Sequence, residues 1–211
     1  MRTRVKICGI TRCEDAVSVA TAGADAIGLV FYEKSPRHVS AASAREISLS
    51  VPPFVTRVAL FKDADQATVD SVLRSVEIDL IQFHGSESAA FCEQFATPYI
   101  KALGLKGVDD VDAFLAERES HYRRSRALLL DGHAPGDAGG KGERFDWSII
   151  GKLTKPVILA GGLKPQNVAQ AVTMAHPYAV DVSSGVESSP GIKDQRLVSE
   201  FISNTIRASM A

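Results

Sequence analysis

Short apolar runs alternate with segments of helical periodicity along nearly the whole chain. The runs predict strands at residues 5–8, 26–31, 57–61, 80–83, 99–103, 127–130, 156–160 and 178–182. Apolar spacing between them predicts helices at about residues 12–22, 41–49, 69–76, 87–95, 111–119, 147–152, 167–175 and 197–206. The third helix is the clearest, because its apolar residues fall at i, i+3, i+4 and i+7: Val69, Val72, Leu73 and Val76.

This succession of strand–helix units predicts a parallel sheet, because parallel neighbours need a crossover of about this length. Eight such units close naturally into a barrel. The main competitor is an open doubly wound sheet, whose first turn usually carries G-x-G-x-x-G, whereas residues 8–11 are Cys-Gly-Ile-Thr. No linker or low-complexity run divides the 211 residues. The sequence therefore predicts an α/β fold, a single (β/α)8 TIM barrel over residues 1–211.

Composition narrows the class of protein. A hydrophobic content of 45% and a charged content of 23% are typical of a soluble globular chain. The formal net charge of −1 favours neither a nucleic-acid partner nor a membrane surface. A small anionic substrate can still be held by a few local cations and backbone amides.

The cysteines and the N-terminus suggest the cellular setting. Cys8, Cys13 and Cys92 are too few, and odd in number, for a disulfide framework, and no histidine stands at zinc-ligand spacing from the first two. We therefore expect no bound metal. The first residues lack the apolar core of a signal peptide, and no stretch approaches the roughly 20 apolar residues of a membrane span. A reduced, cytoplasmic setting is the resulting expectation.

In a barrel of this kind the active site lies at the carboxyl ends of the strands. Because alternate side chains of a strand face opposite sides, polar residues at these ends can be assigned to the interior. The inward-facing set comprises Lys6 and Cys8 of the first strand, Asp131 beside Leu129 of the sixth, and Asp181 and Ser183 of the eighth. A buried charge without a partner is costly, so such a cluster usually serves a ligand or a reaction.

Each of these residues also has a purely structural interpretation. A cysteine that ends a strand is often a small core residue, although the nearby Lys6 is expected to lower the pKa of Cys8. Asp131 precedes a glycine and can cap a helix or a turn. His84, before Gly85, is more typical of a hydrogen-bonded structural histidine than of a base.

Glycines and serines after the last two strands predict a phosphate site. Gly161 and Gly162 follow the seventh strand, and residues 183–185 (Ser183, Ser184 and Gly185) follow the eighth. Many barrels bind phosphate with backbone amides at this position. A helix N-terminus near residues 193–194 would add its dipole. The glycine pair alone is also compatible with a simple tight turn.

Several of these segments carry a resemblance to one family. They are residues 5–11 (Val-Lys-Ile-Cys-Gly-Ile-Thr), 35–37 (Ser-Pro-Arg), 82–85 (Gln-Phe-His-Gly), 130–131 (Leu-Asp), 139–142 (Gly-Gly-Lys-Gly), 145–147 (Phe-Asp-Trp), 159–163 (Leu-Ala-Gly-Gly-Leu) and 181–187 (Asp-Val-Ser-Ser-Gly-Val-Glu). In order, from about residue 4 to residue 201, the chain resembles the phosphoribosylanthranilate isomerases of the tryptophan pathway. The first and last motifs are the most specific.

The resemblance implies roles for individual residues. Cys8 would be the general base and Asp131 the general acid. Arg37 would bind the carboxylate of the anthranilate, a role suited to a planar guanidinium. Lys6, His84 and Asp181 would complete the substrate site, with Asp181 facing the sugar hydroxyls. The phosphate would lie against Gly161, Gly162, Ser183, Ser184 and Gly185. One departure is Lys141, where the family usually has threonine; we interpret this lysine as solvated, in a glycine-rich segment, residues 136–144, that suits a lid.

The reaction implied is an Amadori rearrangement of a phosphoribosyl substrate, with no metal or organic cofactor. It requires a protonated acid, although an aspartic acid has an ordinary pKa of about 3.9. Burial of Asp131 is expected to raise that value. Three alternatives stay open: the histidine-pathway isomerase, which has aspartate where Cys8 stands; an enzyme that serves both pathways; and a non-catalytic sensor of phosphate ligands. A monomer is expected, with a homodimer as the alternative.

Overall fold

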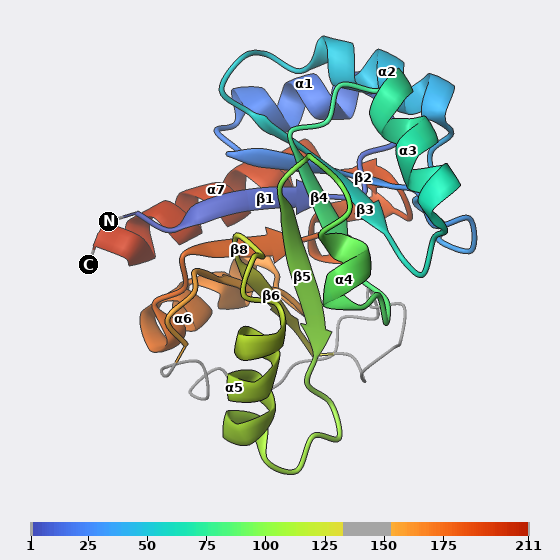
Figure 1. Cartoon of the computed structure of the whole chain (residues 1–211). Helices are drawn as coiled ribbons and strands as arrows, with labels where there is room; N and C mark the ends of the chain where they lie inside the picture. The colour runs from blue at the N-terminus through green and yellow to red at the C-terminus, as the bar shows by residue number, and fades with distance from the viewer. Residues whose placement is uncertain (1, 133–152, 211) are drawn as a thin grey trace.

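Eight parallel strands close into a barrel in the order of the chain, β1 to β8, in the computed structural model, which describes residues 2–132 and 153–210. The strands are β1 (Arg4–Cys8), β2 (Ala26–Val30), β3 (Thr56–Phe61), β4 (Leu80–Phe83), β5 (Tyr99–Gly104), β6 (Leu128–Asp131), β7 (Val157–Leu159) and β8 (Ala179–Val182). Parallel pairing of β1 with β8 closes the ring. The predicted TIM barrel is therefore confirmed (Figure 1).

Helices surround the strands, and both chain ends lie on the same side of the barrel (Figure 1). The helices in the described part of the chain are α1 (Cys13–Thr21), α2 (Ala41–Ser50), α3 (Gln66–Ser75), α4 (Ala89–Cys92), α5 (Val111–His121), α6 (Pro165–Ala175) and α7 (Gln195–Met210). None of these helices is long and apolar enough to cross a membrane. The helix predicted at residues 147–152, Lys141 and the segment 136–144 lie outside the described residues.

Helix α4 is shorter than the 87–95 predicted from the sequence. Its N-terminus is set by Ser88, whose side chain accepts a hydrogen bond from the backbone N–H of Phe91. Glu87 stays outside the helix because its buried carboxylate binds Lys101 at 2.8 Å and the backbone N–H groups of Asp63 and Gly85. Long-range contacts of this kind leave no trace in local periodicity.

Strand alternation divides the core into an inner and an outer layer. Leu128 and Leu130 pack with the surrounding helices, while Leu129 packs with a separate cluster of barrel residues: Ile100, Ala102, Ala127, Ile158, Ala160 and Ala179. This is the inward and outward assignment that the sequence predicted for β6. The inner layer fills the barrel below its carboxyl end, so the inward-facing polar residues near the carboxyl ends of β1, β6 and β8 face an open pocket.

A short hairpin after β8 was not predicted. The chain makes one 3-10 turn at η2 (Ser184–Val186) and then the antiparallel strands β9 (Glu187–Ser189) and β10 (Ile192–Lys193). The hairpin is fastened to the segment after β1, because Thr11 Oγ1 donates a 2.6 Å hydrogen bond to the carbonyl of Gly191. It thereby places additional charged side chains beside the end of the barrel.

Candidate active site

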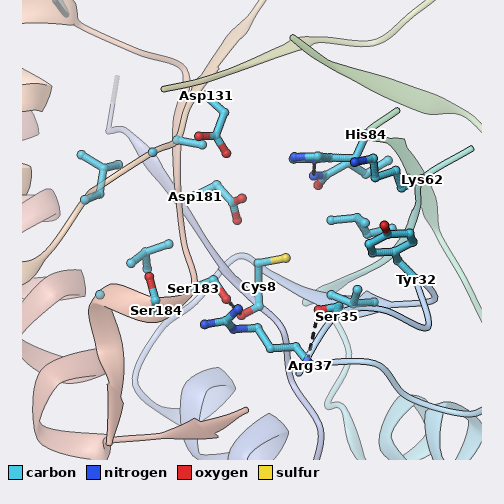
Figure 2. A pocket seen from close by; sticks show the side chains of 18 of the residues that line it. Cys8, Tyr32, Ser35, Arg37, Lys62, His84, Asp131, Asp181, Ser183 and Ser184 are labelled. Atoms are coloured by element: carbon cyan, nitrogen blue, oxygen red, sulfur yellow. Dashed lines mark hydrogen bonds between the residues drawn. The ribbon is translucent and has the colours of Figure 1, made fainter. Parts of the chain in front are cut away.

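One pocket opens at the carboxyl ends of the barrel strands, and it collects nearly all the residues singled out from the sequence (Figure 2). Its lining includes Cys8, Arg37, His84, Asp131, Gly161, Gly162, Asp181, Ser183, Ser184 and Gly185. Lys6 is the exception, since it lies one layer deeper in the barrel and contacts the pocket residues from below.

Cys8 ends β1 and directs its Sγ into the pocket (Figure 2). Burial raises the pKa of this thiol, the ammonium of Lys6 lowers it, and the carboxylate of Asp181 raises it further. The net direction is upward. Lys6 lowers the pKa of Cys8 as expected, but it does not leave the thiol with a lowered pKa, because desolvation of the enclosed thiol outweighs a single cation that is itself paired with a carboxylate.

Lys6 and Asp181 form an ion pair inside the barrel, with Nζ and Oδ1 2.8 Å apart. Their strands pair in a register that places these two residues side by side. Burial lowers the pKa of Lys6, but Asp181 and Cys8 outweigh this effect and the pKa is raised. Burial also raises the pKa of Asp181, more than Lys6 lowers it. The pair supplies a charged floor immediately below the thiol.

Asp131 ends β6 and is buried. Figure 2 shows its carboxyl group above that of Asp181, both directed toward the centre of the pocket. The two carboxyl groups are close enough to interact, since Asp131 contributes to the raised pKa of Asp181. Acid and base candidates thus stand on different strands around one cavity.

His84 follows β4 and is hydrogen-bonded, the feature expected of a structural histidine. Its Nδ1 lies 2.9 Å from Nε2 of Gln82, a buried side chain that also lines the pocket. The Gln82 amide nitrogen can only donate, so Nδ1 is the acceptor and the proton of the neutral ring resides on Nε2. The contact fixes the orientation of the ring at the pocket wall.

Arg37 reaches the pocket from the segment after β2, and its partner was missed by the sequence analysis. Its Nε and Nη2 donate to the two carboxylate oxygens of Glu187 at 2.8 and 2.7 Å. Burial raises the pKa of Glu187, but Arg37 and Lys193 lower it more. Glu187 was visible in the sequence only as the last residue of the motif at 181–187.

The loops after β7 and β8 form one end of the pocket, with Ser183 Oγ donating to the carbonyl of Cys8 at 3.0 Å. They contact one another closely at Gly185, where a Cβ atom would lie 1.9 Å from the carbonyl oxygen of Leu163. The expected helix N-terminus does not belong to this end. Lys193 and Asp194 do not line the pocket, and the side chain of Lys193 is bound to Glu187 instead.

The opposite wall contains side chains that the sequence analysis did not select. Tyr32, Lys34 and Lys62 line it, and the Lys62 ammonium lies 5.3 Å from the centre of the Tyr32 ring. All three follow strands β2 and β3, so the strand-end rule would have included them. Across residues 2–132 and 153–210, no group of three or more His, Cys, Asp or Glu side chains is arranged to hold a metal ion.

A family model described as N-(5'phosphoribosyl)anthranilate (PRA) isomerase matches residues 5–204. The chain belongs to this family. An N-(5'-phosphoribosyl)anthranilate isomerase of Pseudomonas fluorescens is 52% identical over 207 residues, which is 98% of this chain and 97% of the relative. That of Alcanivorax borkumensis is 53% identical and covers 95% of this chain and 94% of its own.

Solved structures of family members agree with the fold. Phosphoribosyl anthranilate isomerase of Thermotoga maritima has a TM-score of 0.86 at 41% identity, over 96% of this chain and 98% of that chain. A family enzyme in complex with reduced 1-(o-carboxyphenylamino)-1-deoxyribulose 5-phosphate has a TM-score of 0.83 at 40% identity, with the same coverage. A thiamine phosphate pyrophosphorylase of Pyrococcus furiosus, at 16% identity and a TM-score of 0.67, shares the fold alone.

Proposed function

We propose that this chain is a single catalytic domain that converts N-(5-phosphoribosyl)anthranilate to 1-(2-carboxyphenylamino)-1-deoxyribulose 5-phosphate, a step of L-tryptophan biosynthesis. The observation that carries the proposal is the arrangement of the candidate acid, base and phosphate-binding loops around one pocket. Cys8 and Asp131 face one cavity from different strands, and glycine- and serine-rich loops form one of its ends. An acid and a base on separate walls can act on two atoms of one bound sugar.

In the proposed reaction Asp131 donates a proton to the furanose ring oxygen, and the ring opens to a Schiff base between the anthranilate nitrogen and C1. Cys8, as the thiolate, removes the proton from C2, and the electrons move into the C1–C2 bond to form an enolamine. Tautomerisation returns a proton to C1 and leaves a ketone at C2. C2 is oxidised from an alcohol to a ketone while C1 is reduced from the aldehyde level to that of an amine-bearing methylene. The molecule therefore undergoes no net redox change, and the substrate nitrogen is the only electron sink needed.

The ion pair of Lys6 and Asp181 would assist proton removal by Cys8 and binding of the sugar. Lys6 favours the thiolate form of Cys8, because it lowers the thiol pKa against the effect of burial. Asp181 holds Lys6 in place and lines the pocket, where its carboxylate is available to the sugar hydroxyls. His84 would contact the substrate from the wall next to these groups.

Two separate sets of donors in the pocket would hold the two anionic groups of the substrate. Backbone amides of Gly161, Gly162 and Gly185, together with the hydroxyl of Ser184, are suited to the phosphate. Ser183 would contribute once its hydroxyl turns from the Cys8 carbonyl. Arg37 is suited to the anthranilate carboxylate, because a guanidinium can donate two parallel hydrogen bonds to it. Binding of both anionic groups would set C1 and C2 between the acid and the base.

The test is to add purified protein to freshly generated phosphoribosylanthranilate and to follow the loss of anthranilate fluorescence, with Cys8→Ser measured in parallel. The proposal expects rapid loss with the wild type and little with the variant. Loss no faster than spontaneous breakdown with the wild type would overturn it and direct attention to the histidine-pathway substrate. A Cys8→Ser variant as fast as the wild type would leave the reaction in place and remove Cys8 as the base.

Assembly and cellular setting belong to the same proposal. We propose a monomer, with a homodimer as the alternative; a Thermotoga maritima relative is described as dimeric. Light scattering after size exclusion distinguishes the 22.6 kDa chain from a species of twice that mass.

Cys8, Cys13 and Cys92 are free thiols, which is compatible with the reduced cytoplasmic setting, and that setting stays a prediction.

A further inference from the structure

A largely buried group of three charges reaches from the pocket wall into the hairpin after β8, and we call its members Arg37, Glu187 and Lys193 the arginine cluster. The Glu187 carboxylate receives Nε and Nη2 of Arg37 on its two oxygens, at 2.8 and 2.7 Å. The same carboxylate receives Nζ of Lys193 at 2.6 Å. The exposed fractions of the side chains are 13% for Arg37, 5% for Glu187 and 1% for Lys193.

The cluster holds the guanidinium in one orientation. A bidentate contact fixes the plane of the group as well as its position. It occupies the Nε–Nη2 edge, and within the described part of the chain no hydrogen bond uses Nη1. Since Arg37 also lines the pocket, an edge with uncommitted N–H groups remains for a ligand.

The surroundings make this orientation hard to change. The stem of Arg37 crosses the backbone at Gly9, whose φ is +76° and where a Cβ atom would lie 2.4 Å from Cδ of Arg37. On the other side, the backbone N–H of Lys193 donates to Asp15 Oδ2 at 3.1 Å, and Lys193 Nζ also donates to the carbonyl of Ser183 at 3.2 Å. The hairpin that carries Glu187 is thus tied to helix α1 and to the loop after β8.

The net charge of the arginine cluster still favours an anionic ligand. Two cations and one anion leave a net charge of +1, so Glu187 does not cancel the attraction of Arg37 for an anion. Lys193 supplies the second positive charge from a site that does not line the pocket. The arrangement orients an arginine by means of a carboxylate without making the site neutral.

We propose that Glu187 and Lys193 are positioning residues that hold Arg37 for the carboxylate of the arylamine, and that the cluster makes the site select a substrate with an ortho carboxylate. This inference rests on the proposed function. It assigns the recognition of the carboxylate to the hairpin, an element separate from the groups that move protons.

Electrostatics alone predicts the opposite result for a neutral variant at Glu187. Removal of an anion next to Arg37 would strengthen the attraction for a substrate carboxylate and lower KM. If Glu187 acts by orientation, the same change releases the guanidinium and raises KM. The sign of the change in KM therefore distinguishes orientation from simple charge.

The experiment compares Glu187→Gln with the wild type on two substrates, phosphoribosylanthranilate and the corresponding phosphoribosyl adduct of aniline, which lacks the carboxylate. We expect KM for the anthranilate to rise on the order of tenfold, the loss of a charge-assisted hydrogen bond, with kcat changed much less. For the aniline adduct, kcat/KM should change less than about twofold, because the group that Arg37 recognises is missing.

Asp79→Asn is the matched control, because Asp79 also binds an arginine through two oxygens. Nε and Nη2 of Arg57 each donate to it at 2.9 Å, at the amino end of β4, away from the pocket. This variant should leave kcat and KM unchanged for both substrates. Thermal unfolding of all variants measures any general loss of stability, and if Glu187→Gln does not fold, Glu187→Asp carries the comparison, since it keeps the charge and shortens the side chain.

A double variant tests whether Glu187 acts through Arg37. In an Arg37→Met background, Glu187→Gln should cause no further increase in KM. An unchanged or lower KM for Glu187→Gln, or equal losses on both substrates, overturns the inference while the turnover of the wild type leaves the proposed function intact. A wild type without activity on phosphoribosylanthranilate overturns the proposed function, and this inference with it.

Discussion

The ammonium of Lys6 lies 2.8 Å from the carboxylate of Asp181 inside the barrel, and both side chains are at most 10% exposed. The two residues are partners across the β1–β8 seam that closes the barrel. Removal of ions from water is expensive, so each of these groups depends on the other for its charge. The pair therefore links the closure of the fold to the environment of Cys8.

The first prediction concerns this pair. Lys6→Met should lower the free energy of unfolding by about 3–5 kcal/mol, because it leaves the Asp181 carboxylate buried without its partner. Urea unfolding followed by circular dichroism measures the change. The double variant Lys6→Met with Asp181→Asn should regain most of the stability and little of the turnover. If the double variant is no more stable than Lys6→Met, lost packing and not the uncompensated charge is the cause.

The second prediction is a pH dependence set by the raised pKa of Cys8. Below this pKa the thiol is protonated and inactive as a base, so kcat/KM should still increase with pH above pH 8. In a variant with Cys13→Ser and Cys92→Ser, the rate of alkylation of Cys8 by iodoacetamide should rise over the same range. A plateau of both rates by pH 7 would contradict a raised pKa. The same shift should reduce stability in alkaline solution, because the unfolded chain ionises first as the pH rises.

The third prediction addresses Asp131. Asp131→Asn keeps the shape of the side chain and removes the acidic proton, so kcat should fall about 10²–10⁴-fold, the usual contribution of general acid catalysis. Binding of the reduced product analogue, measured by calorimetry, should change little, since that ligand needs no proton transfer. Near-wild-type turnover would exclude Asp131 as the acid. Loss of analogue binding together with turnover would indicate a binding role.

The fourth prediction tests the phosphate end of the pocket. Gly185→Ala places a Cβ atom 1.9 Å from the Leu163 carbonyl, so the loops after β7 and β8 must move apart. We expect KM to rise roughly tenfold, as when a charge-assisted hydrogen bond is lost, and competitive inhibition by inorganic phosphate to weaken in parallel. Gly107→Ala is the control, because no atom lies within 4 Å of a Cβ there, although its φ of +77° adds a small strain. Unchanged phosphate inhibition in Gly185→Ala would argue against a phosphate at this end.

Local patterns were sufficient for the barrel because its strands are buried and regular. Leu128, Leu129 and Leu130 show this best, since alternate residues of a strand face opposite layers and the outer and inner clusters divide them accordingly. Helix α4 and the hairpin of β9 and β10 were misjudged or missed for the opposite reason. The start of α4 depends on the contact of Glu87 with Lys101, and the position of the hairpin depends on the contact of Gly191 with Thr11. Both partners are distant along the chain.

The positions of the candidate site followed from one rule and from motifs. Strand ends of a parallel barrel converge, so Cys8, Asp131 and Asp181 could be placed around one pocket from their positions in the sequence alone. The electrostatic environment of each group in the pocket could not be predicted in the same way. The pKa of Cys8 depends on the balance between burial, Lys6 and Asp181, and that balance exists only when all of them are assembled.

The sequence by itself determined the order of strands and helices, the barrel, and the side of it that carries the polar residues, because these depend on periodicities within a few residues. The tertiary structure decided the direction of the Cys8 pKa and the partners of Arg37. Arg37 and Glu187 are 150 positions apart, and their contact depends on the closure that brings the hairpin after β8 beside the segment after β2. Burial and charge pairing are properties of that assembled environment, and no local stretch of sequence contains them.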